Sequence, residues 1–449
     1  MSAVTEGSLV HIVAEGAQPL TGDQTDFDAV VSLATNARVV LIGEASHGTH
    51  EFYRIRAEIT KRLIRELGFN GVAAEADWPD AHRINRYVHA RGSDADATDA
   101  LRDFARFPQW MWRNADVLDF VGWLREHNDD VSDDKKAGFY GLDLYSLHSS
   151  MAAVLNYLRT IDPEAAQRAE QRYACFDHFG PDPQNYGYAA GLGLAPTCER
   201  EVMSQLLELQ RASAEYARRD GRLDPDALFY AQENARIVRN AERYYRTMFL
   251  GGEKSWNLRD THMTETLVSL LSHLSKPGRE AKLVVWAHNS HLGDARATAM
   301  GADGQLNVGQ LARERYGEKA LLVGFTTYAG TVTAARDWDE PAERRTVRPG
   351  LRGSYEALFH QTGFSRFYLD LRRDSEVKAG LGEPMLERAI GVIYRPETER
   401  QSHYFRASLA GQFDAVFHYD HTRAVEPLER NPVWIRGENE MPETYPSTL

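Results

Sequence analysis

Short apolar runs separated by polar or glycine-containing turns dominate the hydrophobic pattern of the chain. These runs are rich in Val, Ile, Leu and Phe and are typical of buried strands in a mostly parallel sheet. The clearest runs cover residues 38–43, 71–75, 138–142, 282–286, 320–324, 366–369, 390–394 and 415–418. Helical patterns lie between the early runs. The pattern therefore predicts an α/β fold whose mostly parallel sheet is flanked by helices.

The segment after Thr49 carries a clear helical pattern. Its apolar residues recur three or four positions apart: Phe52, Ile55, Ile59 and Leu63. Arg56 shares the face that these residues bury, and a buried charge without a partner is costly. The pattern predicts a helix in which Arg56 pairs with Glu44 or Glu75. The alternative is an arginine at the edge of the apolar stripe, with its charged head in water.

Between residues 146 and 276 the strand pattern stops and long helical patterns replace it. The best of them spans residues 225–250. We expect an all-helical lobe, residues 146–276, inserted into an α/β catalytic domain made of residues 1–145 and 277–449. The stretch 180–193 is rich in Gly, Pro, Asn and Tyr and predicts a long loop within this lobe. Two interpretations of it stay open, a lid and an ordinary connection.

Carboxylates and histidines directly follow four of the predicted strands. They are Glu44 and His47 after the first strand, Glu75 after the second, Asp143 after the third, and His288 and His291 after the fourth. Ligands of α/β sheets bind beyond the carboxyl ends of the strands, so we expect these groups to converge on one site. A carboxylate beside an imidazole can poise a general base near neutral pH.

His47 is the strongest candidate for a general base. It lies in a turn three residues after Glu44. This spacing lets the carboxylate hold one ring nitrogen while the other nitrogen faces a reactant. Structural roles remain as alternatives, because His47 could bind only the backbone of the turn. Glu44 and Glu75 could likewise act as caps that accept backbone amides.

The other candidate residues carry weaker signals. His288 and His291 are three residues apart, which suits two metal ligands or one catalytic and one structural histidine. Asp143 is well placed to cap the following helix. Trp78 and Trp112 could line an apolar substrate pocket, although aromatic side chains at such positions usually belong to the core.

Several well-known catalytic motifs are incomplete or absent. Ser46 lacks the first glycine of the G-x-S-x-G turn of serine hydrolases. His50 and Glu51 begin an H-E-x-x-H zinc motif, but Arg54 stands where the second histidine is required. Neither a P-loop nor a G-x-G-x-x-G fingerprint occurs, which argues against nucleotide-dependent chemistry.

Composition narrows the class of protein further. The 449 residues are 43% hydrophobic, and 52 Lys and Arg face 65 Asp and Glu, for a formal net charge of −13. This balance argues against a nucleic acid or a membrane surface as the main partner. The start of the chain lacks a signal-peptide pattern, and we expect a cytoplasmic protein. Cys175 and Cys198 are too few for a disulfide framework and lack metal-ligand spacing, so we expect free thiols in a reducing compartment.

Six sequence blocks carry a resemblance to a known family. They are residues 41–52 (LIGEASHGTHEF), 75–78 (EADW), 107–114 (FPQWMWRN), 255–260 (SWNLRD), 286–291 (WAHNSH) and 394–400 (YRPETER). In their order and number these blocks resemble the erythromycin esterase family. The likeness extends over nearly the whole chain, from about residue 37 to 428.

This resemblance implies a hydrolase that opens a macrolide lactone ester with water and forms no covalent acyl-enzyme. The family's general base falls on His47, and its arginine falls on Arg56. Its acidic and histidine partners fall on Glu44, Glu75 and His288. Each of these positions holds the residue type that the family requires. The family also contains many members without demonstrated macrolide activity.

We therefore expect direct attack of water on a small-molecule carboxylic ester, with no cofactor. A macrolide substrate would make the protein an antibiotic-resistance enzyme. In this hypothesis Glu44 orients His47, and Glu75 positions the water or the base. His288 polarises the carbonyl or protonates the leaving alkoxide, and Arg56 fixes the carboxylates or steadies the oxyanion.

Two alternatives stay open at the level of sequence. In the first, a divalent metal ion bound by Glu44, His47, Glu75 and His288 activates the water. In the second, the protein is not an enzyme and binds a macrolide or another small molecule. The oligomeric state is also left open.

Overall fold

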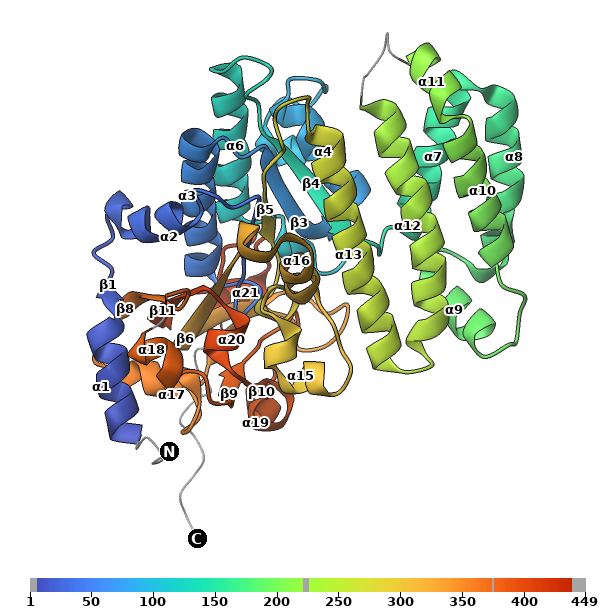
Figure 1. The fold of residues 1–449 in the computed structure, drawn as a ribbon. Coiled ribbons are helices and arrows are strands. Elements are labelled where there is room, and N and C mark those ends of the chain that lie inside the picture. The colour runs from blue at the N-terminus through green and yellow to red at the C-terminus, as the bar shows by residue number, and fades with distance from the viewer. Residues whose placement is uncertain (1–5, 221–225, 374, 438–449) are drawn as a thin grey trace.

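The computed structural model describes residues 6–220, 226–373 and 375–437, and a nine-stranded sheet lies at its centre (Figure 1). The strands are β1 (Gln18–Pro19), β2 (Val39–Ile42), β3 (Gly71–Asp77), β4 (Gly138–Asp143), β5 (Leu283–Trp286), β6 (Ala320–Ala334), β7 (Glu343–Val347), β8 (Arg366–Asp370) and β11 (Ala415–Thr422). Their order is β1-β8-β11-β6-β2-β5-β3-β4, and β7 pairs with β6. The run from β11 to β4 is parallel throughout, which confirms the predicted α/β class.

Alternate residues of the central strands pack under different layers of helices. Val40 and Ile42 face the layer formed by α2 (Asp28–Leu33), α3 (His50–Leu67), α4 (Trp78–Val88) and α6 (Ala115–Asp129). Val39 and Leu41 face the layer formed by α1 (Glu6–Gly16), α13 (Gly252–Leu274), α16 (Val308–Tyr316), α17 (Tyr355–His360) and α20 (Leu409–Gln412). Burial on both faces explains why these strands appear in the sequence as continuous apolar runs.

Short elements complete the sheet domain. The short helices are α5 (Ala97–Ala100), α14 (Asn289–Leu292), α15 (Ala299–Ala302), α18 (Glu376–Gly380), α19 (Glu399–Ser402) and α21 (Pro432–Arg436). The strands β9 (Met385–Arg388) and β10 (Tyr404–Ala407) form a separate antiparallel pair.

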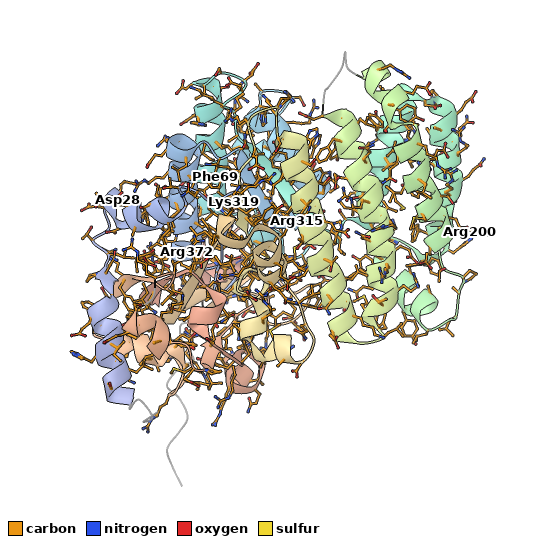
Figure 2. All side chains as sticks on the ribbon, in the orientation of Figure 1. Asp28, Phe69, Arg200, Arg315, Lys319 and Arg372 are labelled. Atoms are coloured by element: carbon orange, nitrogen blue, oxygen red, sulfur yellow. A yellow bond between two sulfur atoms is a disulfide. The ribbon has the colours of Figure 1, made fainter. Side chains whose placement is uncertain are left out.

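The chain between β4 and β5 is helical, as the sequence predicts. It forms α7 (Leu147–Ile161), α8 (Pro163–Tyr173), α9 (Pro183–Gly191), α10 (Glu199–Arg211), α11 (Ser213–Asp220), α12 (Ala227–Met248) and α13. Helices α7 to α12 share a core of their own, whereas α13 packs on the sheet and against α12. Arg200 on α10 points away from the sheet at the outer side of this part (Figure 2). Among the described residues, no helix combines the length and apolarity needed to cross a membrane.

Two of the local predictions are wrong. Residues 390–394 form no strand, because Ile390 and Ile393 each make only an isolated bridge, with Ser46 and Ala335. The stretch 180–193 is not a long loop, since most of it forms α9. Helix α9 lies so close to α12 that a Cβ on Gly187 would collide with the backbone of α12. The role of this segment as a lid stays a prediction.

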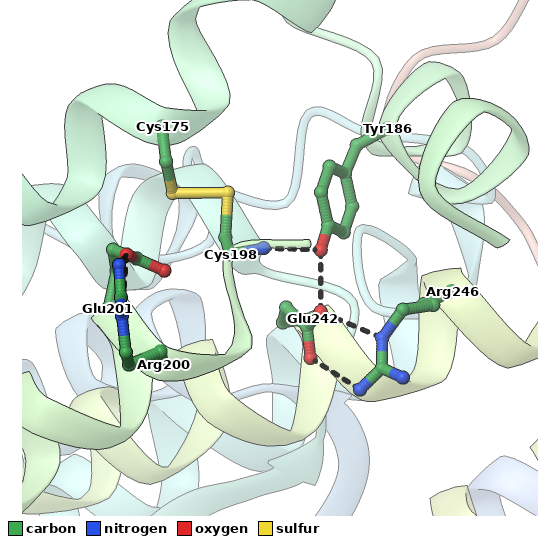
Figure 3. Close-up of a disulfide and its surroundings, with 7 residues drawn as sticks. All are labelled: Cys175, Tyr186, Cys198, Arg200, Glu201, Glu242 and Arg246. Carbon is green, nitrogen blue, oxygen red and sulfur yellow. Dashed lines mark hydrogen bonds and ion pairs between the residues drawn. A yellow bond between two sulfur atoms is a disulfide. The ribbon is translucent and has the colours of Figure 1, made fainter. Parts of the chain in front are cut away.

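The expectation of two free thiols is also wrong, because Cys175 and Cys198 form a disulfide (Figure 3). The bond joins the end of α8 to the start of α10 and closes the segment that carries α9. Tyr186 of α9 lies beside it, where its hydroxyl accepts a hydrogen bond from the Cys198 backbone and donates one to Glu242 of α12. The disulfide therefore fixes a segment that is also bonded to the neighbouring helix.

We predict that opening this disulfide loosens the helical part locally. The two cysteines are 23 residues apart in sequence, and closing a loop of that length stabilises a fold by about 3 kcal/mol. A Cys175→Ser/Cys198→Ser variant should therefore show faster amide exchange in α9 and α10, measured by hydrogen exchange, with little change in α3. Equal exchange in both proteins would contradict a stabilising role.

Candidate active site

The first part of the site is the turn between β2 and α3. Gly48 in this turn has φ of 74°, and a Cβ there would collide with the backbone of Thr333, so the position requires glycine. The turn brings His47 Nδ1 to 2.8 Å from Glu44 Oε1. A carboxylate only accepts hydrogen bonds, so Nδ1 carries a proton, and in the neutral form of the ring Nε2 is the acceptor. His47 is thus held in the tautomer that a general base requires.

Arg56 of α3 lies behind this pair. Its side chain is fully buried, and Nη1 is 3.2 Å from Glu44 Oε2. Its guanidinium group also lies over the rings of Tyr53 and Trp286, at 4.1 and 4.8 Å from their centres. Burial alone would raise the pKa of Glu44, but Arg56 and His47 outweigh it and lower that pKa. Arg56 therefore keeps Glu44 ionised, in the pairing that the sequence predicts.

His288 follows β5 and faces His47, with 4.9 Å between the ring centres. Its Nδ1 accepts a hydrogen bond from the backbone N–H of Ser290 at 3.1 Å. Burial, and after it the nearby His47, lowers the pKa of His288 to about 3, so the ring is neutral and its proton sits on Nε2. This Nε2 is buried and has no hydrogen-bond partner. His288 is therefore a neutral donor without a bound acceptor, beside the acceptor of His47.

Glu75 lies at the end of β3, and both of its carboxylate oxygens are engaged. Oε2 accepts the backbone N–H of His288 at 3.0 Å, while Oε1 lies 2.7 Å from Arg259 Nη2 and 3.3 Å from His291 Nε2. Burial would raise the pKa of Glu75, but His291 and Arg259 outweigh it and hold the pKa well below its usual value. Asp143 accepts two further hydrogen bonds from Arg259, at 3.0 and 2.6 Å.

His291 connects this network to α13. Its Nδ1 is 2.9 Å from Asp260 Oδ1, and the ring stacks on Trp256 at 4.4 Å. Burial disfavours the charge on His291, but Asp260 and Glu75 outweigh burial and raise its pKa to about 9. The two carboxylates thus favour the charged form of the ring, although Arg259 Nη1 also lies 3.1 Å from Nε2.

We predict that the charge on His291 makes stability depend on pH. Its pKa rises from 6.5 in the unfolded chain to about 9 in the fold, so its contribution is complete below pH 6.5 and is lost as the pH rises through about 9. The difference in free energy of unfolding between the wild type and a His291→Gln variant should shrink across this range, as measured by urea denaturation. A difference that is constant from pH 6 to 9.5 would contradict this charge assignment.

The sequence suggested no role for Arg259 and Asp260, although both lie in one of the blocks that carry the family resemblance. They sit side by side on α13, and both are buried or nearly so. The signal that could have found them is the one that found Arg56. It is a charged residue three or four positions from the buried residues of a long helix.

A cavity of about 320 Å³ opens at this edge of the sheet. His47, Glu75, His288 and His291 line its floor, and Arg259 and Trp256 of α13 line one side. Trp112 is part of its aromatic lining, as predicted. Trp78 is not, because its ring packs in the core against Tyr140, Phe229 and Tyr230. The cavity therefore joins the candidate catalytic groups to an aromatic wall.

The side chains proposed as metal ligands already have partners within the protein. Among residues 6–220, 226–373 and 375–437, no group of three His, Cys, Asp or Glu side chains has the geometry to hold one. The two glutamates proposed as ligands are already paired, Glu44 with Arg56 and His47, and Glu75 with Arg259 and His291. A metal ion bound by either glutamate would have to compete with these partners.

An α/β fold with a carboxylate-held histidine, a second histidine facing it and a cavity at the strand exits is an arrangement that hydrolytic enzymes use. More particularly, the chain belongs to the erythromycin esterase family, whose model matches residues 64–422. Glu44, His47 and Arg56 precede the matched span, so their assignment rests on the geometry described above.

Individual relatives are distant in sequence. The chain is 25% identical to erythromycin esterase type II of Escherichia coli over 326 residues, which cover 69% of this chain and 73% of that protein. It is 21% identical to erythromycin esterase type I of Escherichia coli over 346 residues, covering 70% and 76% of the two chains.

Two solved structures share the fold. A succinoglycan biosynthesis protein superposes with a TM-score of 0.74 at 21% identity, over 95% of this chain and 100% of that one. A histidine-to-asparagine mutant of the erythromycin esterase EreC in its open conformation gives a TM-score of 0.66 at 18% identity, over 94% and 98% of the chains.

Proposed function

We propose that the protein hydrolyses a carboxylic ester by direct attack of water that His47 activates. The observation that carries this proposal is that the rings of His47 and His288 face each other in the lining of the cavity, with 4.9 Å between their centres. His47 is held by Glu44 through Nδ1, and Nε2 of His288 has no hydrogen-bond partner. A water molecule and an ester carbonyl together would satisfy both nitrogens.

In this mechanism the water oxygen attacks the carbonyl carbon while His47 Nε2 takes the proton of the water. The negative charge that develops on the carbonyl oxygen accepts a hydrogen bond from His288 Nε2–H. The carbon–oxygen bond to the alcohol then breaks, and the imidazolium of His47 returns its proton to the leaving alkoxide. The products are a carboxylic acid and an alcohol, and no bond to the protein forms.

The remaining candidates act on these two histidines. Arg56 does not line the cavity, so its role is to hold Glu44 rather than the oxyanion. Both oxygens of Glu75 are occupied, so it anchors the backbone of His288 instead of positioning the water. The low pKa of His288 favours a hydrogen-bond donor over a proton donor for the leaving group.

The test is incubation of EDTA-treated protein with simple esters, lactones and macrolides, followed by mass spectrometry. Gain of one water by at least one ester supports the proposal. Activity that is lost in EDTA and restored by a divalent metal would favour a metal-dependent hydrolase instead. Ligands that bind tightly but never gain water would favour a binding protein.

A further inference from the structure

Two aromatic residues from opposite sides of the site meet across it. In the sheet, β2 and β5 lie side by side, with β6 next to β2 and β3 next to β5. The exits of the inner pair carry His47 and His288. The connections that follow β3 and β6 therefore leave the sheet on either side of these two exits.

Phe107 and Trp338 make this contact. Phe107 belongs to the connection from β3 to β4, and Trp338 to the connection from β6 to β7. Their ring centres are 4.9 Å apart, and both rings line the cavity that contains His47 and His288. Trp338 is nevertheless 48% exposed, which places it at the mouth of the cavity rather than in its interior.

Polar contacts anchor the backbone on each side of this aromatic pair. On the β3 side, Arg106 Nη2 is 2.7 Å from Asp77 Oδ2. On the β6 side, Arg395 Nη2 is 2.7 Å from Asp337 Oδ2, and Arg395 Nε donates to the carbonyl oxygen of Arg336 at 2.9 Å. The segments that carry the two rings are thus each linked by polar contacts to a neighbouring segment.

The cavity beneath the pair is small. Its volume of about 320 Å³ lies near the lower end of the range of about 300–1,000 Å³ found for small-molecule pockets. A bulky ester would have to separate the two rings, whereas a compact ester would fit beneath them.

We propose that Phe107 and Trp338 form a size filter that makes the site selective for compact carboxylic esters over bulky ones, macrolides included. This inference rests on the proposed function and adds the size of the substrate to it. Trp338 is the determining residue, because its large exposed ring is held over the site by one ring contact and can be truncated without opening the core.

The test compares p-nitrophenyl acetate with p-nitrophenyl adamantanecarboxylate as compact and bulky substrates. The quantity measured is the ratio of their kcat/KM values, which cancels the different intrinsic reactivity of the esters when variants are compared. In Trp338→Ala the ratio should move toward the bulky ester by about tenfold or more. Trp338→Phe, which keeps a ring at the mouth, should remain close to the wild type.

Tyr188→Ala is the matched control. Tyr188 and Phe249 are also an exposed aromatic pair, with 5.8 Å between their ring centres, but they lie on α9 and after α12 and do not line the cavity. This variant should leave the ratio unchanged. An unchanged ratio in Trp338→Ala, or an equal change in Tyr188→Ala, would overturn the size filter.

Ketone analogues, in which a methylene group replaces the ester oxygen, cannot be hydrolysed. Their binding therefore tests the size filter separately from the proposed function. Calorimetry should detect the compact ketone in the wild type and in Trp338→Ala, and the bulky ketone only in the variant. If the ketones bind in this way but the protein cleaves no ester, the size filter is supported and the proposed esterase activity is rejected. Equal affinity of both proteins for the bulky ketone would reject the filter even if esters are cleaved.

Discussion

Replacing His47 with Asn is expected to lower kcat for ester hydrolysis by a factor of about 10³, because a positioned general base contributes about 10²–10⁴. In the proposed mechanism His47 provides the acceptor nitrogen that takes the proton from water, and Glu44 holds its other nitrogen. The measurement is steady-state hydrolysis of p-nitrophenyl acetate. Binding of the matching ketone, which requires no proton transfer, should be retained.

His50→Gln is the control for this variant. His50 is three residues further along the chain, at the start of α3, and its Nδ1 binds Asp116 at 2.9 Å rather than facing the cavity. This variant should keep its activity within about twofold of the wild type, since surface substitutions are usually mild. A His47→Asn variant that retained a tenth or more of the wild-type kcat would contradict the assignment of the base.

Replacing Arg56 with Met should have the second large effect, this time on stability. Removal of one partner of a buried ion pair costs about 3–5 kcal/mol, because it leaves an uncompensated charge in the interior. Arg56 and Glu44 are both fully buried, and Arg56 is the cation that holds the charge of Glu44. The free energy of unfolding, measured by urea denaturation, should fall by that amount.

Two further variants test this explanation. Arg62→Met removes an arginine of the same helix whose partners, Asp28 and Glu66, are exposed, and it should cost less than about 1 kcal/mol. The double variant Glu44→Gln/Arg56→Met removes both charges and should recover part of the loss. If Arg56→Met and Arg62→Met were equally mild, the buried pair would not support the fold as proposed.

The sequence predicted the sheet and the convergence of the site because both depend on local patterns. Apolar runs mark strands that are covered on two faces, and the exits of parallel strands must meet at one edge. The wrong strand prediction for residues 390–394 also comes from a local apolar run. Its end residues, Ile390 and Tyr394, are buried, but the run has no continuous partner strand, and an apolar run alone does not show whether a partner strand exists.

The features that the sequence did not predict depend on distances between remote segments. The cysteines meet because α8 and α10 pack together, and spacing in the chain gives no indication of this. Arg259 and Asp260 reach the strand exits because α13 packs on the sheet. Helical patterns alone placed this helix in the inserted lobe and could not show its contact with the sheet. Trp78 is the first residue of α4, directly after β3. Its side chain packs in the core on the face of the sheet that α13 covers, which the sequence pattern does not show.

The central claim, direct attack of water at a His47 site, is tested most directly by a single turnover of a cleaved ester in ¹⁸O-labelled water with excess protein. Mass spectrometry then follows both the acid product and the intact protein. The mechanism predicts an acid that carries one ¹⁸O atom and a protein whose mass never changes. A protein that gains the mass of the acyl group before the acid appears would contradict it.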